Sequence, residues 1–252
     1  MKKKLLLILE VLFAGIFIFS AYKIFMIYDE SNKSTEYYEK VRKNYGVEEN
    51  QGEESRVKVN PYEDTVEELR KVNEDVLGWI KINGSKVDYP VAAGVDNEFY
   101  LKHLIDKTYN EYGAIFMDMH NSGDFSDQHT VIYGHNALNG TMFGSLKNYK
   151  DEEYFKEHPR IIVYQKDQVL VYEIFGFGEI NVTSDIYRFD FESDQDFINF
   201  SKELCSQLST EEEFSVSDRI LTLSTCTDFN DAKRFIISAK LLEIKNPDED
   251  LR

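Results

Sequence analysis

Three side chains that could carry out nucleophilic catalysis fall at the ends of apolar, strand-like runs. The run ILTLSTC, residues 220–226, brings Cys226 to its carboxyl end. After a polar loop over residues 227–233, Arg234 opens the next apolar run, FIISAKLLEI. A strand, a short loop and a returning strand place Cys226 and Arg234 at the same end of a sheet. The tract VIYGHN ends a third run and carries His135 into a turn rich in Gly and Asn.

These residue types suit nucleophilic catalysis. An Arg beside a Cys lowers the thiol pKa from its free value of about 8.5, and its guanidinium can donate to a developing oxyanion. A catalytic thiol also needs a proton carrier, and His titrates near neutral pH. The spacing therefore predicts Cys226 as nucleophile, His135 as general acid and base, and Arg234 as oxyanion stabiliser.

Each residue taken alone also has a structural interpretation. Cys226 could be a small buried hydrophobe, His135 a hydrogen-bonded loop residue and Arg234 an ion-pair partner. Cys205 lies within a predicted helix and is interpreted as a packing residue. A Cys205–Cys226 disulfide, which would block the thiol, stays open as a competing arrangement.

Metals, cofactors and nucleic acid are not expected. The remaining histidines lack H-x-H or H-x3-H spacing, no Gly-rich phosphate loop occurs, and two cysteines are too few for a disulfide scaffold. The chain has 29 basic and 46 acidic side chains, a net charge of −17, which disfavours binding to phosphate backbones.

Short strand-like runs dominate the region after Gly78. They predict a mainly β fold with about eight strands in a closed or nearly closed barrel. Two helices are expected, at 64–76 and at 194–208, the second capped by Ser193. The expected strands are 79–82, 87–92, 113–119, 130–133, 160–164, 169–177, 219–225 and 234–244.

The first 28 residues differ in character from the rest. Lysines at positions 2–4 precede an apolar run from Leu5 to Tyr28 that is long enough to span a bilayer. The lysines favour a cytoplasmic N-terminus, so the remaining chain would be extracytoplasmic; a cleaved signal peptide is the alternative. We predict an anchor at 1–28, a partly helical stalk or linker at 29–62 and a catalytic domain at 63–252.

The motifs together resemble the sortase family. The resemblance is carried by TLSTC (222–226), Arg234 and YGHN (133–136), and it covers about residues 63–244. Four further tracts are similar to class B: 76–91, 96–103, 113–118 and 135–149. The expected helix at 194–208 sits where class B carries an extra helix between strands 6 and 7 of its eight-stranded barrel. One departure is Met119-His120, where Tyr-Arg would be expected.

The resemblance implies a cysteine transpeptidase. Cys226 would attack the Thr carbonyl of a C-terminal sorting signal of NPQTN or NPxTG type on a secreted surface protein. A peptidoglycan amine would then resolve the thioacyl intermediate. Similarity to the family also assigns five residues to the substrate groove: Asn97, Leu101, Tyr133, Tyr187 and Ser224.

Two other functions stay open. An extracytoplasmic cysteine peptidase would use the same three residues and transfer the acyl group to water. A non-enzymatic surface binding module would keep Cys226 buried or disulfide-bonded.

Overall fold

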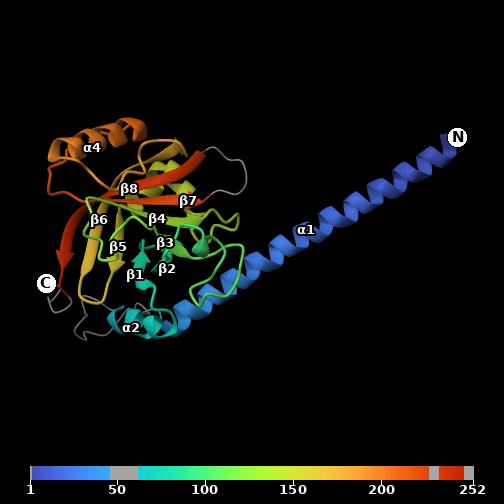
Figure 1. Ribbon diagram of the computed structural model, residues 1–252, viewed down its shortest axis with the longest axis horizontal. Helices are drawn as coiled ribbons and strands as arrows, with labels where there is room; N and C mark the ends of the chain where they lie inside the picture. The colour runs from blue at the N-terminus through green and yellow to red at the C-terminus, as the bar shows by residue number, and fades with distance from the viewer. Residues whose placement is uncertain (1, 46–61, 227–232, 247–252) are drawn as a thin grey trace.

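A closed barrel of eight strands forms the body of the chain (Figure 1). The computed structural model describes residues 2–45, 62–226 and 233–246, with only the backbone of Lys2 and Cys226. Around the barrel the order is β1-β2-β3-β4-β7-β8-β6-β5, and β5 pairs with β1 to close it. The strands are β1 (Val76–Lys81), β2 (Asp88–Ala93), β3 (Ile115–Met117), β4 (His129–His135), β5 (Arg160–Tyr164), β6 (Val169–Asn181), β7 (Ile220–Cys226) and β8 (Lys233–Lys245).

The predicted mainly β barrel is therefore confirmed, as is the extra helix between β6 and β7. This helix, α4 (Asp194–Leu208), begins where expected, and the Ser193 hydroxyl accepts a hydrogen bond from the Asp196 amide at 3.3 Å. The helix expected at 64–76 is shorter than predicted: α2 (Glu63–Val72) ends because Asn73 is extended and Val76 already starts β1. The remaining helices are α1 (Lys2–Tyr45), η1 (Phe99–Leu101), η2 (Leu146–Lys150) and α3 (Glu152–Glu157).

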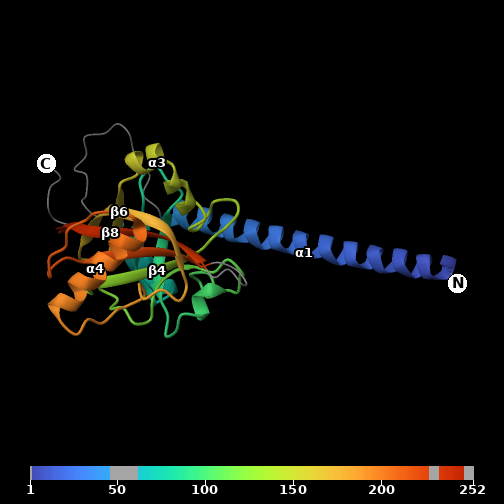
Figure 2. The same cartoon turned by 90° about the horizontal axis from the view of Figure 1, so that it is seen from above.

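Alternation along β4, β7 and β8 separates two apolar clusters. Ile132, Leu223 and Ile237 point into the barrel and join its main core. Side chains of the opposite parity, such as Ile220 and Ile236, point outward and pack under α4 with Phe197 and Leu204. Figure 2 shows α4 lying across the outside of the barrel. The rest of this outer face, toward the carboxyl ends of β4 and β7, lies beyond the α4 cluster.

Helix α1 runs without a break from the apolar segment onto the barrel (Figure 1). Residues 3–27 are exposed, but Tyr38 is buried and its hydroxyl donates to the Gly113 carbonyl at 3.0 Å. Arg42 Nη1 lies 3.4 Å from the Asp88 carbonyl oxygen. The expected stalk is thus helical as far as Tyr45 and packs on the barrel; the expected linker over 46–60 lies outside the described residues.

The N-terminal part of α1 meets the length and composition of a membrane span. The described helix has an 18-residue window of mean hydropathy 2.4 with none of that window buried. A signal sequence near an N-terminus would satisfy the same criterion, so the boundaries of anchor, stalk and catalytic domain stay predictions.

Gly113 offers a test of how tightly this docking site is built. Its φ is +60°, and a Cβ would lie 2.2 Å from the Tyr100 carbonyl oxygen. Gly140 is the matched control, because its φ is +77° while the nearest atom to a Cβ, Lys86 Nζ, lies at 3.4 Å. Both Gly→Ala changes should pay about 1–2 kcal/mol for left-handed backbone, and Gly113→Ala about 1–3 kcal/mol more for the clash. Urea unfolding in detergent measures the free energy of unfolding of both variants. An equal loss of stability in the two would contradict the tight packing around Gly113.

Candidate active site

The carboxyl ends of β4 and β7 bring together two of the three predicted catalytic residues. These strands are parallel, and their register pairs His129 with Ile220 and His135 with Cys226. Neighbouring strands lie about 4.8 Å apart, so the two backbones are adjacent at the residues singled out from the sequence. The side chain of Cys226 lies outside the described atoms.

Arg234 lies on β8, the other neighbour of β7. The antiparallel register ends with the pair Ser224–Ile236, and Cys226 and Arg234 each lie two residues beyond that pair. The side chain of Arg234 is half-buried, and its Nη1 donates to the Lys233 carbonyl at 3.1 Å. The predicted loop that joins the strands, with Asp228 and Asp231, lies mostly outside the described residues.

Parity places all three positions on the outer face of the barrel. His135 follows His129, Val131 and Tyr133 on β4, and Cys226 follows Thr222 and Ser224 on β7. Arg234 precedes Ile236 and Ser238 on β8. Ile236 and Ile180, which pair with Ser224 and Arg234, pack in the cluster under α4, so this cluster reaches the β8 side of the site.

The His135 ring packs against Tyr112, with ring centroids 4.6 Å apart. On this side of the ring lies a hollow of about 510 Å³ between the barrel and α1. Its lining residues are Lys23, Met26, Ile27, Glu30, Lys102, Glu111, Tyr112 and His135. His135 is therefore reachable from the side of α1.

Three of the predicted groove residues meet beside the predicted catalytic positions. The Tyr187 hydroxyl lies 2.9 Å from Ser224 Oγ, and the rings of Tyr187 and Tyr133 are 6.2 Å apart. Ser224 is buried, whereas both tyrosines are partly exposed. In the predicted groove, the segment between β6 and α4 would form one wall, and β4 and β7 would form the floor.

Asp118, which the sequence analysis did not single out, organises the opposite wall. Its Oδ2 accepts from the Tyr133 hydroxyl at 2.8 Å and from Asn97 Nδ2 at 2.9 Å. Its Oδ1 accepts from the backbone amide and Nδ1 of His120 at 2.9 and 2.8 Å. Asn97 Oδ1 in turn accepts from the Met119 amide at 2.8 Å. Although Met119-His120 departs from the family pattern, Asn97 is still linked to Tyr133 through the shared acceptor Asp118.

Leu101, the last predicted groove residue, ends η1 and is about one-third exposed. It immediately precedes Lys102, which lines the hollow beside His135. Asn97 thus lies two residues before η1 and is bonded to Asp118, whereas Leu101 is the last residue of η1.

A buried hydrogen-bond chain supports the wall that carries Tyr187. His129 Nδ1 lies 2.8 Å from the Arg188 carbonyl oxygen, and its Nε2 lies 2.9 Å from Thr222 Oγ1. Thr222 Oγ1 is 3.0 Å from Ser238 Oγ. Burial lowers the pKa of His129 to about 4, so at neutral pH Nδ1–H donates to Arg188 and Nε2 accepts from Thr222.

Cys205 is a different kind of cysteine. It is a buried free thiol on α4, with Sγ 3.8 Å from the Glu212 carbonyl oxygen. Burial raises its pKa, so it is a poorer thiolate than an ordinary cysteine. Its burial on α4 agrees with the packing role expected for it.

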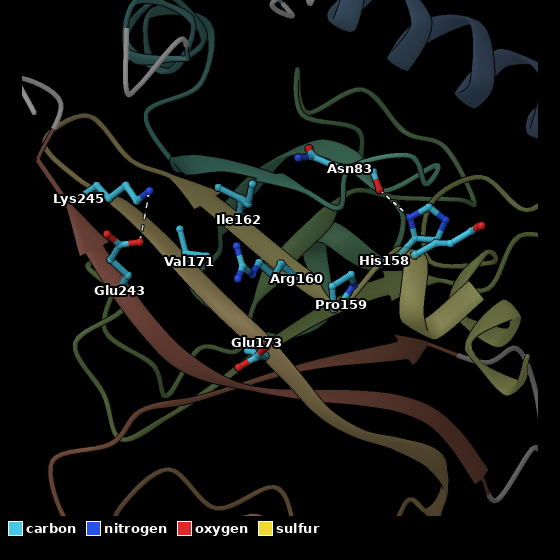
Figure 3. A pocket seen from close by; sticks show the side chains of 10 residues that line it. Asn83, His158, Pro159, Arg160, Ile162, Val171, Glu173, Glu243 and Lys245 are labelled. Atoms are coloured by element: carbon cyan, nitrogen blue, oxygen red, sulfur yellow. Dashed lines mark hydrogen bonds and ion pairs between the residues drawn. The ribbon is translucent and has the colours of Figure 1, made fainter. Parts of the chain in front are cut away.

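A second hollow, of about 360 Å³, lies across β5, β6 and the end of β8 (Figure 3). His158 Nδ1 lies 2.7 Å from the Asn83 carbonyl oxygen at one end, and Lys245 pairs with Glu243 at 3.2 Å at the other. None of the predicted site residues is among those that line it. Within the described part of the chain, no group of three or more His, Cys, Asp or Glu could hold a metal ion.

Comparison with known proteins identifies the family. The profile described as Sortase domain matches residues 80–242. Sortase B of Staphylococcus aureus (strain NCTC 8325 / PS 47) is 31% identical over 96% of this chain and 98% of its own length. Sortase B of Listeria monocytogenes serovar 1/2a (strain ATCC BAA-679 / EGD-e) is 31% identical over 90% of this chain and 93% of its own length.

Solved structures agree with this assignment. The Staphylococcus aureus sortase B–substrate complex has a TM-score of 0.68 and 32% identity, covering 72% of this chain and 86% of that one. A sortase B complexed with triglycine has a TM-score of 0.66 and 33% identity, with the same coverage. With its profile match, its full-length relatives and its barrel all in agreement, the chain belongs to the sortase family of cysteine transpeptidases, in class B.

Proposed function

We propose that this transpeptidase cleaves a C-terminal sorting signal of NPQTN or NPxTG type after Thr and joins the released carbonyl to a peptidoglycan amine. The observation that carries the proposal is the parallel register that pairs His135 with Cys226. A nucleophile and its proton carrier must be neighbours, and this register makes their backbones adjacent.

The reaction divides into two acyl transfers. The Cys226 thiolate attacks the Thr carbonyl carbon, and His135 as imidazolium gives its proton to the leaving amine as the peptide bond breaks. The acceptor amine then attacks the thioacyl carbon, His135 takes a proton from it, and Cys226 leaves as thiolate. Arg234 donates to the oxyanion of both tetrahedral intermediates.

The sorting signal binds along the groove residues beside these groups. Support comes from the hydrogen bond between Tyr187 and Ser224 and from the Asp118 wall that holds Asn97 and Tyr133. Leu101 extends this surface at the end of η1. A substrate-bound relative and a triglycine-bound relative of similar fold support a peptide signal and an amine acceptor as the two substrates.

The chain crosses the membrane once through α1, with its N-terminus in the cytoplasm and the barrel outside. Support comes from the length and hydropathy of α1 and from the lysines that precede the apolar run. Secreted surface proteins and the peptidoglycan amine then lie on the same side as the barrel.

The test of the proposal is acyl-enzyme formation followed by amide formation. With a fluorogenic NPQTN peptide, Cys226→Ala should give no acyl-enzyme by mass spectrometry because the nucleophile is gone. Cys205→Ala, a matched change at a buried packing thiol, should keep most of the activity. An acyl group on Cys226→Ala, or complete loss in Cys205→Ala, would mean that the two thiols are misassigned. Product that is only hydrolysed when triglycine is supplied would favour the peptidase alternative.

Arg234→Lys tests the oxyanion role. Lysine keeps the positive charge but lacks the planar fork of donors, so kcat/KM should fall by roughly 10²–10³, as for a lost oxyanion donor. The control is Lys233→Arg, the opposite substitution at the neighbouring residue, which should change kcat/KM little. Near-normal turnover in Arg234→Lys would remove this residue from the mechanism.

Asp118→Asn tests whether the opposite wall positions the groove. The carboxylate accepts four hydrogen bonds. The amide of asparagine has only one accepting oxygen, and its NH2 group would face groups that are themselves hydrogen-bond donors. If the loss of these bonds weakens peptide binding by about 1.4 kcal/mol, KM for the peptide rises about tenfold, with a smaller effect on kcat.

Asp127→Asn is the control for this change. Asp127 Oδ2 accepts from Asn121 Nδ2 and the Ser122 amide, within the same loop, and neither of these bonds reaches Tyr133. An equal rise of KM in both variants would indicate a general loosening of the loop and would argue against a specific role for Asp118.

A further inference from the structure

The hollow beside His135 has one wall made by the membrane-proximal part of α1. Lys23, Met26, Ile27 and Glu30 repeat at helical spacing and line it together with Lys102, Glu111 and Tyr112. Two contacts join this part of α1 to the barrel: Asn110 Nδ2 lies 3.0 Å from Glu30 Oε2, and Asn139 Nδ2 lies 3.2 Å from Ser31 Oγ. The hollow is therefore part of the docked unit of helix and barrel.

The position of these residues along α1 sets the height of the hollow above a bilayer. The apolar run from Leu5 to Tyr28 is 24 residues long, which is about 36 Å of helix at 1.5 Å per residue. The hydrocarbon core is about 30 Å thick. Residues 23–30 therefore lie at its outer edge and in the headgroup layer, and the hollow opens there.

We propose that this hollow is the entrance through which the amine acceptor reaches the thioacyl group, at the level of the lipid headgroups. The inference rests on the proposed function and adds the route and binding surface of the second substrate. The sorting signal lies along Tyr133, Ser224 and Tyr187, whereas the hollow opens at His135 on the side of α1. The two substrates thus approach the reacting carbonyl from different directions.

The chemistry of the second step requires such a placement. The amine nitrogen forms a bond to the thioacyl carbon, the carbon–sulfur bond breaks, and the sulfur leaves with its electron pair. The nitrogen gives up one proton, which His135 receives. The acceptor must therefore stand beside His135 at that moment, and the hollow is a space next to this ring that the groove residues do not occupy.

The lining suits a short peptide that ends in a primary amine. Met26, Ile27 and Tyr112 offer apolar surface, and the rest of the lining holds two carboxylates, Glu30 and Glu111, beside two ammonium groups, Lys23 and Lys102. A hydrogen bond from Tyr109 lowers the pKa of Glu111, which keeps it anionic. Lys102 Nζ lies 3.3 Å from Glu111 Oε2, so an incoming ammonium would compete for a pairing that the site already makes.

The experiment narrows the hollow and measures the two half-reactions separately. Full-length protein in lipid nanodiscs carries Ile27→Trp, which adds an indole to the wall. Ile24→Trp is the matched control, because Ile24 is on the same helix, is likewise exposed and is not part of the lining. A fluorogenic NPQTN peptide reports acylation, and triglycine or hydroxylamine serves as acceptor.

Ile27→Trp should acylate like wild type but form less amide with triglycine, with the ratio of amide to hydrolysed product falling about tenfold or more. Hydroxylamine, being small, should react alike in all three proteins, and Ile24→Trp should match wild type throughout. An unchanged triglycine ratio in Ile27→Trp with normal acylation would overturn the entrance. Absence of any acyl-enzyme in wild type would instead overturn the proposed function, and the entrance with it.

Discussion

The parallel pairing of β4 with β7 is the constraint on which the rest of the site depends. Parallel neighbours end at the same edge, so a residue at the carboxyl end of each strand becomes a neighbour of the other without any special loop. Such a pair needs a long crossover, and here the chain between residues 136 and 219 supplies β5, β6 and α4. The antiparallel return into β8 then adds Arg234 on the other side of β7. One register thus fixes the backbone spacing of two candidate catalytic residues, and a second, between β7 and β8, brings the third to the same end of the sheet.

The same outer face also buries polar groups, and these need hydrogen-bond partners within the protein. Under α4, His129, Thr222 and Ser238 form a chain across three strands in which each polar atom has a partner. The histidine stays neutral because burial opposes its charge, so it holds the Arg188 carbonyl by a hydrogen bond of fixed direction. Tyr187 precedes Arg188 and reaches Ser224 from that anchored segment. The polar chain under α4 therefore supports the segment that carries Tyr187, which is proposed to bind the sorting signal.

Much of this arrangement could be predicted because it is local in sequence. Strand alternation, the Ser193 cap and the strand-end positions of His135, Cys226 and Arg234 all lie within short windows. Asp118 could not be found in this way, although a buried carboxylate directly after a strand is a signal, because its partners Asn97 and Tyr133 come from other segments. The continuation of α1 through residues 29–45 was obscured by its polar composition. The contacts that bury Tyr38 come from residues far along the chain: its hydroxyl donates to the Gly113 carbonyl, 75 residues away, and its ring packs against Tyr89.

That continuous helix changes what an anchor would do for the enzyme. A flexible tether would let the barrel sample many heights, and an acceptor at the membrane surface would meet the site only part of the time. A helix that passes from the apolar run directly into contacts with Gly113 and Asp88 removes the bending freedom between them. With α1 as the proposed span, the end of the barrel that carries His135 is held at the headgroup layer. Holding one substrate site at that height lowers the entropy lost when the second substrate is bound, so docking of α1 becomes part of how the second acyl transfer is positioned.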